Sequence, residues 1–157
     1  STKEAYKPVS VDTEDYASVL FKTEEGVNGS FTVSQISPGY KNQLKIEISG
    51  EKASFNWDQE TGNQLWVGYK NQPNQIIMKD PLLLSDRYAR HIHMPGGHIE
   101  GWLDSFSSLL NDYYGAIMKI DGHTEVLYPT FEHGAQVMKV IDSILQSSEQ
   151  KRWVVVK

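Results

Sequence analysis

Apolar and polar residues alternate with a period of two through most of residues 15–80, which is the pattern of β-strands that bury one face. Glycine, asparagine, proline and acidic residues interrupt the alternation at short intervals and mark tight turns. Short turns join antiparallel neighbours. We therefore expect three hairpins, whose strands we place at the following ranges: 17–22 with 29–36, 44–49 with 53–57, and 64–69 with 75–79.

The period changes in the second half of the chain. Residues 81–97 hold proline, paired glycine and histidines without a stable period, which predicts a long ordered loop of the kind that is often functional. Apolar residues then recur every three or four positions over 100–120 and over 130–148, which predicts two amphipathic helices. Thr130 is suited to cap the second helix, and the β-branched tail 152–156 predicts a closing strand.

Strands followed by helices indicate an α+β fold: a mostly antiparallel, twisted open sheet of about six or more strands with helices packed on one face. We expect residues 1–157 to form a single domain, because a chain of this length needs only one core. Two amphipathic helices cannot cover both faces of such a sheet. Aromatic residues, namely Trp57, Trp66 and Tyr69, are spread through its strands, and we expect some of them to point away from the helices. Since large exposed apolar surfaces mark partner contacts, we expect the open face to form the subunit interface of a homo-oligomer.

Composition excludes several classes of function. The formal net charge is −5 without a basic block, so the electrostatic footprint of a nucleic-acid partner is missing. The absence of cysteine excludes disulfides, thiolate ligands and a cysteine nucleophile, and it is compatible with a cytoplasmic location. Apolar runs such as 81–84 are far shorter than the roughly 20 residues that span a bilayer, so we expect no membrane partner.

The densest polar cluster is the segment 90–100, which holds three histidines and ends in a carboxylate. Imidazole and carboxylate groups are ligands that zinc accepts. The spacing, however, is neither a helical i, i+4 pair nor a His-x-His arrangement with the expected glutamate, so a metal site is the minor alternative. Glu100 and Asp104 stand four residues apart, and we attribute both to the favourable N-terminal end of a helix.

A ligand contact fits this segment better than a metal. The Gly96-Gly97 pair lets the backbone approach a ligand closely, and His98 stands just before a helix that can hold it at the mouth of a cleft. A tight turn with His98 as a plain helix-entry residue is the structural alternative. No Gly-x-Gly-x-x-Gly, P-loop or Gly-x-Ser-x-Gly is present, so we expect neither a cofactor-binding nor a catalytic residue in this chain.

An ordered succession of segments resembles one family. Residues 11–20, 29–35 and 46–57 are similar to the second domain of the glucose-fructose oxidoreductase, inositol dehydrogenase and MocA (Gfo/Idh/MocA) family. The segment 95–101, which leads into a helix, and Tyr-Pro-Thr-Phe at 128–131 resemble the sugar dehydrogenase branch of that family. The resemblance covers nearly the whole chain.

The resemblance implies a parent enzyme that passes a hydride between NAD or NADP and a hydroxyl carbon of a sugar or polyol. The cofactor and the family's catalytic groups, a Glu-Lys-Pro lysine and an Asp-x-x-x-His pair, would lie upstream, with the cofactor on a Rossmann domain. This chain alone would then be inactive. The resemblance further implies that His98 lies nearest the substrate, with Gly97, His93 and Arg90 as additional contacts to hydroxyl groups.

The opening STKEAYKP resembles a connector, so we expect a C-terminal substrate-binding and oligomerisation domain that is separated from its Rossmann half. Two alternatives stay open. One is a non-enzymatic module that binds a small ligand and dimerises through its sheet, and the other is a histidine-dependent metalloenzyme. A Rossmann fingerprint upstream would argue against the first, and near-stoichiometric metal would favour the second.

Overall fold

The computed structural model describes residues 8–119 and 126–157. The connector predicted at the start of the chain lies almost entirely outside these residues. The strands are β1 (Tyr16–Lys22), β2 (Asn28–Ser34), β3 (Lys45–Ser49), β4 (Ala53–Asp58), β5 (Gln64–Tyr69) and β6 (Gln75–Met78). The helices are α1 (Asp86–Ala89), α2 (Trp102–Met118) and α3 (Phe131–Gln150), with 3₁₀ turns η1 (Gln59–Thr61) and η2 (Pro81–Leu83).

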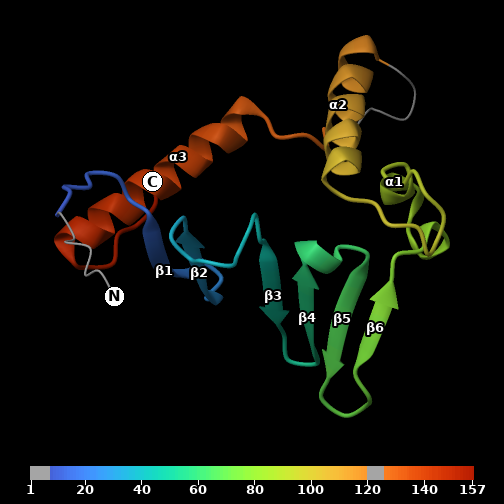
Figure 1. Cartoon of the computed structure of the whole chain (residues 1–157), viewed down its shortest axis with the longest axis horizontal. Coiled ribbons are helices and arrows are strands. Elements are labelled where there is room, and N and C mark those ends of the chain that lie inside the picture. Colours follow the sequence, from blue (N-terminus) through green and yellow to red (C-terminus); the bar gives the residue numbers. More distant parts are fainter. Residues whose placement is uncertain (1–7, 120–125) are drawn as a thin grey trace, which may run out of the picture. The chain divides into compact units, whose positions relative to one another are not determined.

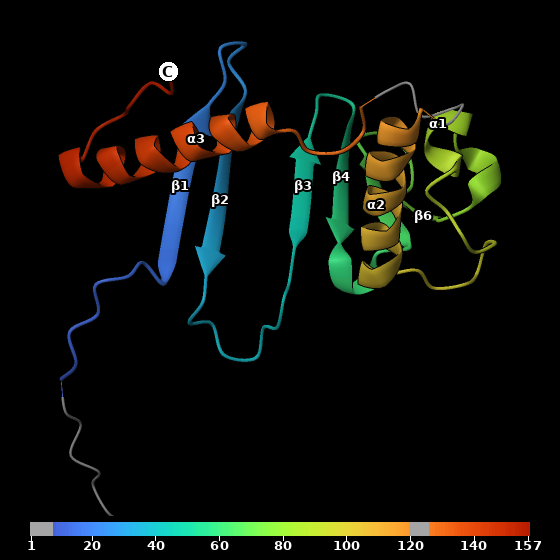
Figure 2. The same ribbon diagram turned by 90° about the horizontal axis from the view of Figure 1, so that it is seen from above.

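The strands form two antiparallel sheets, one with the order β1-β2 and one with the order β3-β4-β5-β6. Figure 1 shows the second sheet as a row of neighbouring arrows that alternate in direction, and Figure 2 shows β3 beside β4 from another side. Each predicted hairpin is present as an antiparallel ladder. The expected α+β fold with mostly antiparallel strands is therefore confirmed.

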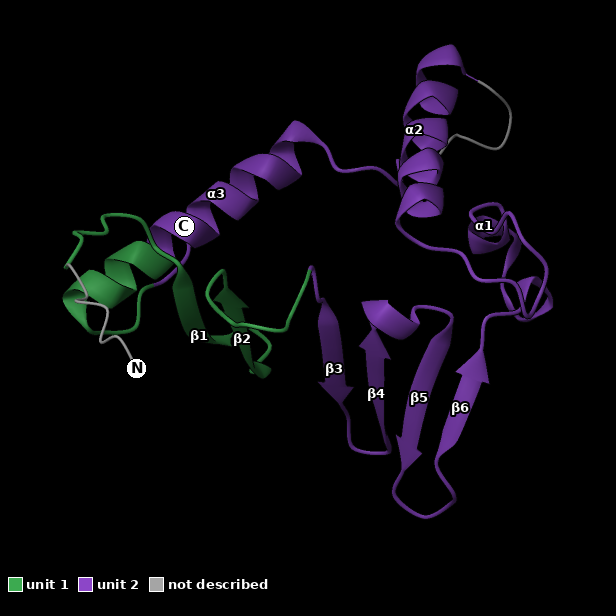
Figure 3. Cartoon of the chain, in the orientation of Figure 1, with its two compact units in different colours: residues 1–41, 144–154 green, residues 42–143, 155–157 purple. Residues whose placement is uncertain are grey.

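The chain divides into two compact units, which Figure 3 shows in different colours. Residues 1–41 and 144–154 make up the first unit, whose described part holds the β1-β2 hairpin and the end of α3. Residues 42–143 and 155–157 make up the second unit, which holds the four-stranded sheet, α1 and α2. All of the segment 90–100 lies in the second unit.

One face of the four-stranded sheet is apolar. The register aligns its side chains in two rows across the strands: Ile46, Trp57, Leu65 and Ile77 in one, and Ile48, Phe55 and Val67 in the next. Val67 is 2% exposed and is the only fully buried apolar side chain among the described residues. Ile48 is 61% exposed and Phe55 is 42% exposed. The described residues therefore leave much of this face in contact with solvent.

Two aromatic rings pack directly against glycine in the strands. A Cβ atom built on Gly68 would lie 2.2 Å from the ring of Trp66, on the same face of β5. In the other sheet, a Cβ on Gly29 would lie 2.1 Å from the ring of Phe21, its partner across the hairpin. A ring that covers a strand glycine shields the backbone that the missing side chain leaves open. A side chain at either position would therefore require the ring to move.

The helix boundaries follow from their capping groups. Gly101 N donates a hydrogen bond of 2.7 Å to Asp104 Oδ2, which confirms the structural role given to Asp104 at the start of α2. Helix α2 ends where Lys119 takes the left-handed conformation, with φ of 54°. Ile120, at the predicted end, lies outside the described residues. At the start of α3, Thr130 Oγ1 accepts from His133 N at 3.4 Å, which agrees with the predicted cap.

The closing strand predicted at 152–156 is wrong, because these residues pair with no strand in the described part of the chain. Lys151 has a φ of 52°, and Arg152 N donates to Ser147 O at 3.3 Å, so the chain turns back at the end of α3. Strand propensity cannot form a ladder without a neighbouring edge. The segment 81–97 also differs from an irregular loop, since η2 and α1 lie within it.

Among the described residues, none of the helices is both long and apolar enough to cross a membrane.

Candidate functional site

The histidine loop, defined here as residues 90–100, joins α1 to α2 and contacts the polar side of α2. His91 Nε2 lies 2.7 Å from Asp112 Oδ2, and the Arg90 guanidinium lies 3.2 Å from Asp112 Oδ1. Asp112 is only 4% exposed. A buried carboxylate is costly unless charged or hydrogen-bonding groups surround it. Arg90 and His91 supply those groups, so the start of the loop is fixed to α2.

A second contact follows one helical turn earlier on α2. His93 Nε2 lies 3.0 Å from Ser108 Oγ, and Ser108 is 7% exposed. His91 and His93 stand two residues apart in the loop, and their partners Asp112 and Ser108 stand four residues apart on α2. The loop and the helix therefore run in opposite directions at this contact.

Glu100 closes the loop at its other end. Its Oε1 accepts hydrogen bonds from His93 N at 2.6 Å and Met94 N at 3.2 Å, and its Oε2 forms an ion pair with Lys79, just after β6. Partial burial opposes ionisation of Glu100, but the hydrogen bond from Lys79 and those from the two backbone amides outweigh it and hold the pKa of Glu100 below its ordinary value. The two ends of the segment 93–100 are thus held together.

His98 lies in the projecting part of this closed segment. Gly97 has a φ of 82°, which only glycine adopts readily. His98 is exposed, and its Nδ1 lies 3.4 Å from Gly96 O, a distance too long to fix the ring firmly. No hydrogen bond engages His98 Nε2 within the described part of the chain. This nitrogen is therefore available to donate to or accept from a bound hydroxyl group.

The structure separates the predicted site residues into two groups. Arg90 and His93 lie at the base of the histidine loop, with their side chains against α2, whereas Gly97 and His98 lie in its projecting part. Across residues 8–119 and 126–157, no three histidine, aspartate or glutamate side chains converge as a metal site would need. The His-x-His pair faces Ser108 and Asp112 instead of a common centre.

Sequence reasoning missed Asp112, Ser108 and Lys79. Asp112 and Ser108 stand four residues apart, and Asp104 extends the same polar row by another turn on a helix that is otherwise rich in apolar residues. That row was the available signal, because residues four apart share one helix face. Lys79 gave no signal, since only the fold brings the end of β6 to Glu100.

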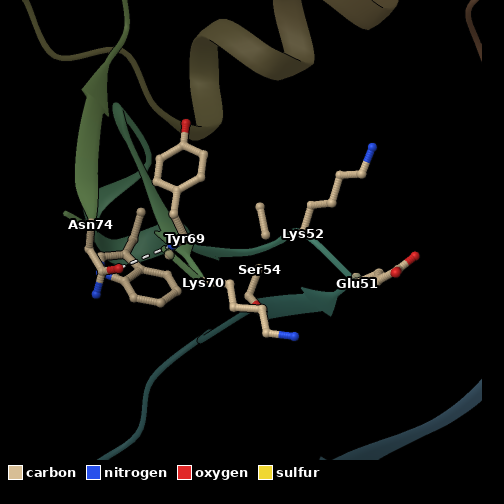
Figure 4. A pocket seen from close by; sticks show the side chains of 10 residues that line it. Glu51, Lys52, Ser54, Tyr69, Lys70 and Asn74 are labelled. Atoms are coloured by element: carbon tan, nitrogen blue, oxygen red, sulfur yellow. Dashed lines mark hydrogen bonds between the residues drawn. The ribbon is translucent and has the colours of Figure 1, made fainter. Parts of the chain in front are cut away.

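A separate hollow of about 500 Å³ lies at the turn end of the four-stranded sheet (Figure 4). Asn74 Oδ1 accepts a hydrogen bond from Tyr69 N at 3.2 Å on its wall. Its remaining lining includes two exposed lysines, Lys52 and Lys70. No residue of the histidine loop lines this hollow, and its polar groups do not form a catalytic arrangement.

A family comparison agrees with this architecture. The model of the C-terminal alpha/beta domain of the Gfo/Idh/MocA oxidoreductase family matches residues 1–156. The match therefore includes both units and the whole histidine loop.

Individual relatives give the same result. An uncharacterised oxidoreductase of Bacillus subtilis, YfiI, is 26% identical over 142 residues, which are 87% of this chain and 36% of YfiI. The crystal structure of an oxidoreductase from Sinorhizobium meliloti is 29% identical, with a TM-score of 0.83 over 92% of this chain and 42% of that protein. An inositol dehydrogenase homologue from Azotobacter vinelandii, in complex with NADH and myo-inositol, is 26% identical, with a TM-score of 0.78 over 87% of this chain and 38% of that protein. The chain thus spans less than half the length of these relatives.

Proposed function

Since the chain belongs to the Gfo/Idh/MocA oxidoreductase family as its C-terminal α/β domain, we propose that it is the substrate-facing part of an NAD(P)-dependent sugar or polyol oxidoreductase. The observation that carries this proposal is the state of His98, whose Nε2 has no hydrogen-bond partner in the described residues. A loop pinned at both ends presents this ring, and pinning reduces the conformational entropy lost when a ligand binds. A polyhydroxylated ligand suits an imidazole that can both donate and accept hydrogen bonds.

The proposed substrate contacts are His98, Gly97, His93 and Arg90. His98 offers its ring, and Gly97 offers a backbone that no side chain screens. His93 and Arg90 contribute through the base of the loop, where each already contacts α2. Hydroxyl recognition depends on such paired donors and acceptors, because an unpaired polar group in a closed site is costly.

The cofactor is proposed to be NAD or NADP, bound by a Rossmann domain outside residues 1–157. The relative from Azotobacter vinelandii binds NADH and myo-inositol, and this chain matches 38% of its length. No glycine-rich nucleotide fingerprint occurs in residues 1–157. The hydride transfer therefore requires residues that this chain does not supply, and the chain alone would be inactive.

The apolar sheet face is proposed to join subunits into a dimer or tetramer. Ile46, Ile48 and Phe55 are between 42% and 61% exposed on that face. Burial of apolar surface contributes roughly 25 cal/mol per Å², so a second copy of this sheet would be stabilised by covering these side chains. The register makes the face contiguous across β3 and β4.

The test is an oxidation assay with the full-length protein that carries this domain. We expect reduction of NAD⁺ or NADP⁺ with at least one member of a panel of sugars, anhydrosugars and cyclitols, and no measurable NADH binding by residues 1–157 alone. Micromolar binding of NADH to residues 1–157 would contradict the assignment of cofactor binding to a separate Rossmann domain. A full-length protein that binds polyols without oxidising them would instead support the non-enzymatic module.

A further inference from the structure

We propose that Asp112 is the positioning residue of this site: its buried carboxylate holds Arg90 and His91 and thereby sets the place at which His98 meets the substrate. The inference rests on the proposed function, because it concerns the same histidine loop. Asp112 itself lies on α2, away from the projecting part of the loop, and is not a catalytic residue.

The first step of the argument is the pairing of Asp112. Both of its oxygens have a partner, His91 Nε2 at 2.7 Å and the Arg90 guanidinium at 3.2 Å. Because Asp112 is only 4% exposed, water competes little for these contacts. The contact with His91 is a hydrogen bond to a carboxylate, which is shorter and stronger than a neutral hydrogen bond, whereas the contact with Arg90 is an ion pair without hydrogen-bond geometry. Asp112 therefore fixes two consecutive loop residues relative to α2.

The second step links this anchor to His98. From His91 the chain runs through His93, whose ring contacts Ser108 and whose backbone N donates to Glu100 Oε1. Glu100 stands one position before Gly101, the N-cap of α2. The segment that carries His98 is thus connected to α2 at both of its ends. A displacement of the Asp112 side chain would move the end that contains Arg90 and His91.

The third step concerns the chemistry that the position requires. An amide at residue 112 keeps the size of the carboxylate but places an N–H group against Arg90 or His91, which both offer donors. It also removes the negative charge that lies 3.2 Å from the Arg90 guanidinium. A glutamate keeps the charge but extends it by one methylene group. We therefore expect a graded loss of positioning, with Asp112→Glu milder than Asp112→Asn.

The experiment is a double-mutant cycle on the full-length protein, with KM and kcat for the preferred polyol measured for Asp112→Asn, Asp112→Glu, His98→Ala and Asp112→Asn/His98→Ala. We expect Asp112→Asn to raise KM about tenfold and Asp112→Glu to raise it less. In the His98→Ala background, Asp112→Asn should raise KM by a clearly smaller factor than in the wild type, because the main group that it positions is already absent. Asn111→Ala, the exposed neighbour on α2, is the control that leaves KM unchanged.

A merely structural role would act differently. If Asp112→Asn changed KM by the same factor with and without His98, the positioning role would be overturned. Thermal unfolding shows whether each variant folds. If Asp112→Asn does not fold, the same KM comparison is made with Asp112→Glu.

A second readout keeps this inference separate from the proposed function. Hydrogen exchange of a peptide covering residues 92–100 reports the amides of His93 and Met94, which donate to Glu100. We expect Asp112→Asn to accelerate this exchange about tenfold relative to Asn111→Ala. Unchanged exchange would overturn the inference even if the enzyme is active, whereas an inactive wild type with accelerated exchange in the variant would reject only the oxidoreductase function.

Discussion

His91 and Asp112 stand 21 residues apart in the sequence, yet the His91 Nε2 and Asp112 Oδ2 atoms lie 2.7 Å apart. This contact, together with the one between His93 and Ser108, explains the His-x-His spacing without a metal ion. His91 and His93 are two residues apart in the loop, and the residues that they contact, Asp112 and Ser108, lie about one turn apart on α2. The histidine cluster therefore has a base that contacts α2 and an exposed part that is proposed to face a ligand, and measurements of KM and of stability distinguish the two.

Replacing His98 with alanine in the full-length protein should raise KM for the polyol substrate by about threefold to tenfold, because one hydrogen bond to a hydroxyl group is lost. The free energy of unfolding should stay nearly constant, since the His98 ring has no close partner in the described residues. Steady-state kinetics and thermal unfolding measure the two effects. His133→Ala is the matched control, because His133 is also exposed but lies at the start of α3. A KM that is equal for His98→Ala and the wild type would remove His98 from the site.

Gly97→Ala tests the backbone of the projecting segment. Nothing lies within 4 Å of the Cβ position, so the change adds no clash, but the φ of 82° strains any residue with a side chain. We expect a loss of about 1 kcal/mol in stability and a higher KM. Gly101→Ala has the same open surroundings with a φ of −148°, so it should lower stability less. Equal unfolding midpoints for the two variants would contradict the expected backbone strain of an alanine at position 97.

Glu100→Gln should remove a pH-dependent part of the stability. The pKa of Glu100 lies below its ordinary value of 4.5 in the folded chain, so its ionised form stabilises the fold above about pH 4.5. That contribution is lost as the pH falls through the lowered pKa. The wild type should therefore be more stable than Glu100→Gln at pH 7, and the difference should shrink toward pH 3. Unfolding midpoints across this range measure it.

The control for this pH series is Glu47→Gln, an exposed carboxylate on β3 without an ion pair in the described part of the chain. Its difference from the wild type should stay nearly constant with pH. A constant difference for Glu100→Gln as well would show that the ion pair with Lys79 adds nothing to stability.

Ile48→Lys should weaken the proposed subunit contact. The change places a charge on the apolar sheet face, where Ile48 is 61% exposed, so the isolated fold tolerates it while a paired face does not. We expect a shift toward the monomer in sedimentation velocity. Ser49→Lys adds the same charge one residue along β3, on the opposite face, and should leave the mass unchanged. Identical sedimentation of both variants and the wild type would exclude this face as an interface.

The hairpins were predictable because their signal is local. Leu44, Ile46 and Ile48 alternate on one strand, and a turn at Gly50 returns the chain directly to its partner. The prediction of a closing strand at 152–156 was wrong because its signal is not sufficient locally. β-Branched residues favour a strand, but they do not show whether the edge of a sheet lies nearby. The one-turn helix α1 is too short to produce a periodic stripe.

The exposed part of the candidate site was also visible in the sequence, but its base was not. The Gly96-Gly97 pair before His98 indicated a segment whose backbone can approach a ligand closely, and the structure gives Gly97 a φ of 82° within that segment. Asp112 belongs to the polar row of α2 that includes Asp104 and Ser108, but its partners come from a loop whose path no periodicity describes. Contacts across 21 residues depend on that path and therefore required the structure.

The most direct test of the account is a crystal structure of the full-length protein with NADH and its polyol substrate. We predict that His98 Nε2 lies within about 3.2 Å of a substrate hydroxyl oxygen, with the His91–Asp112 contact intact at the base of the loop. A substrate whose hydroxyl groups are all bound by residues outside this domain, with His98 still facing solvent, would contradict it.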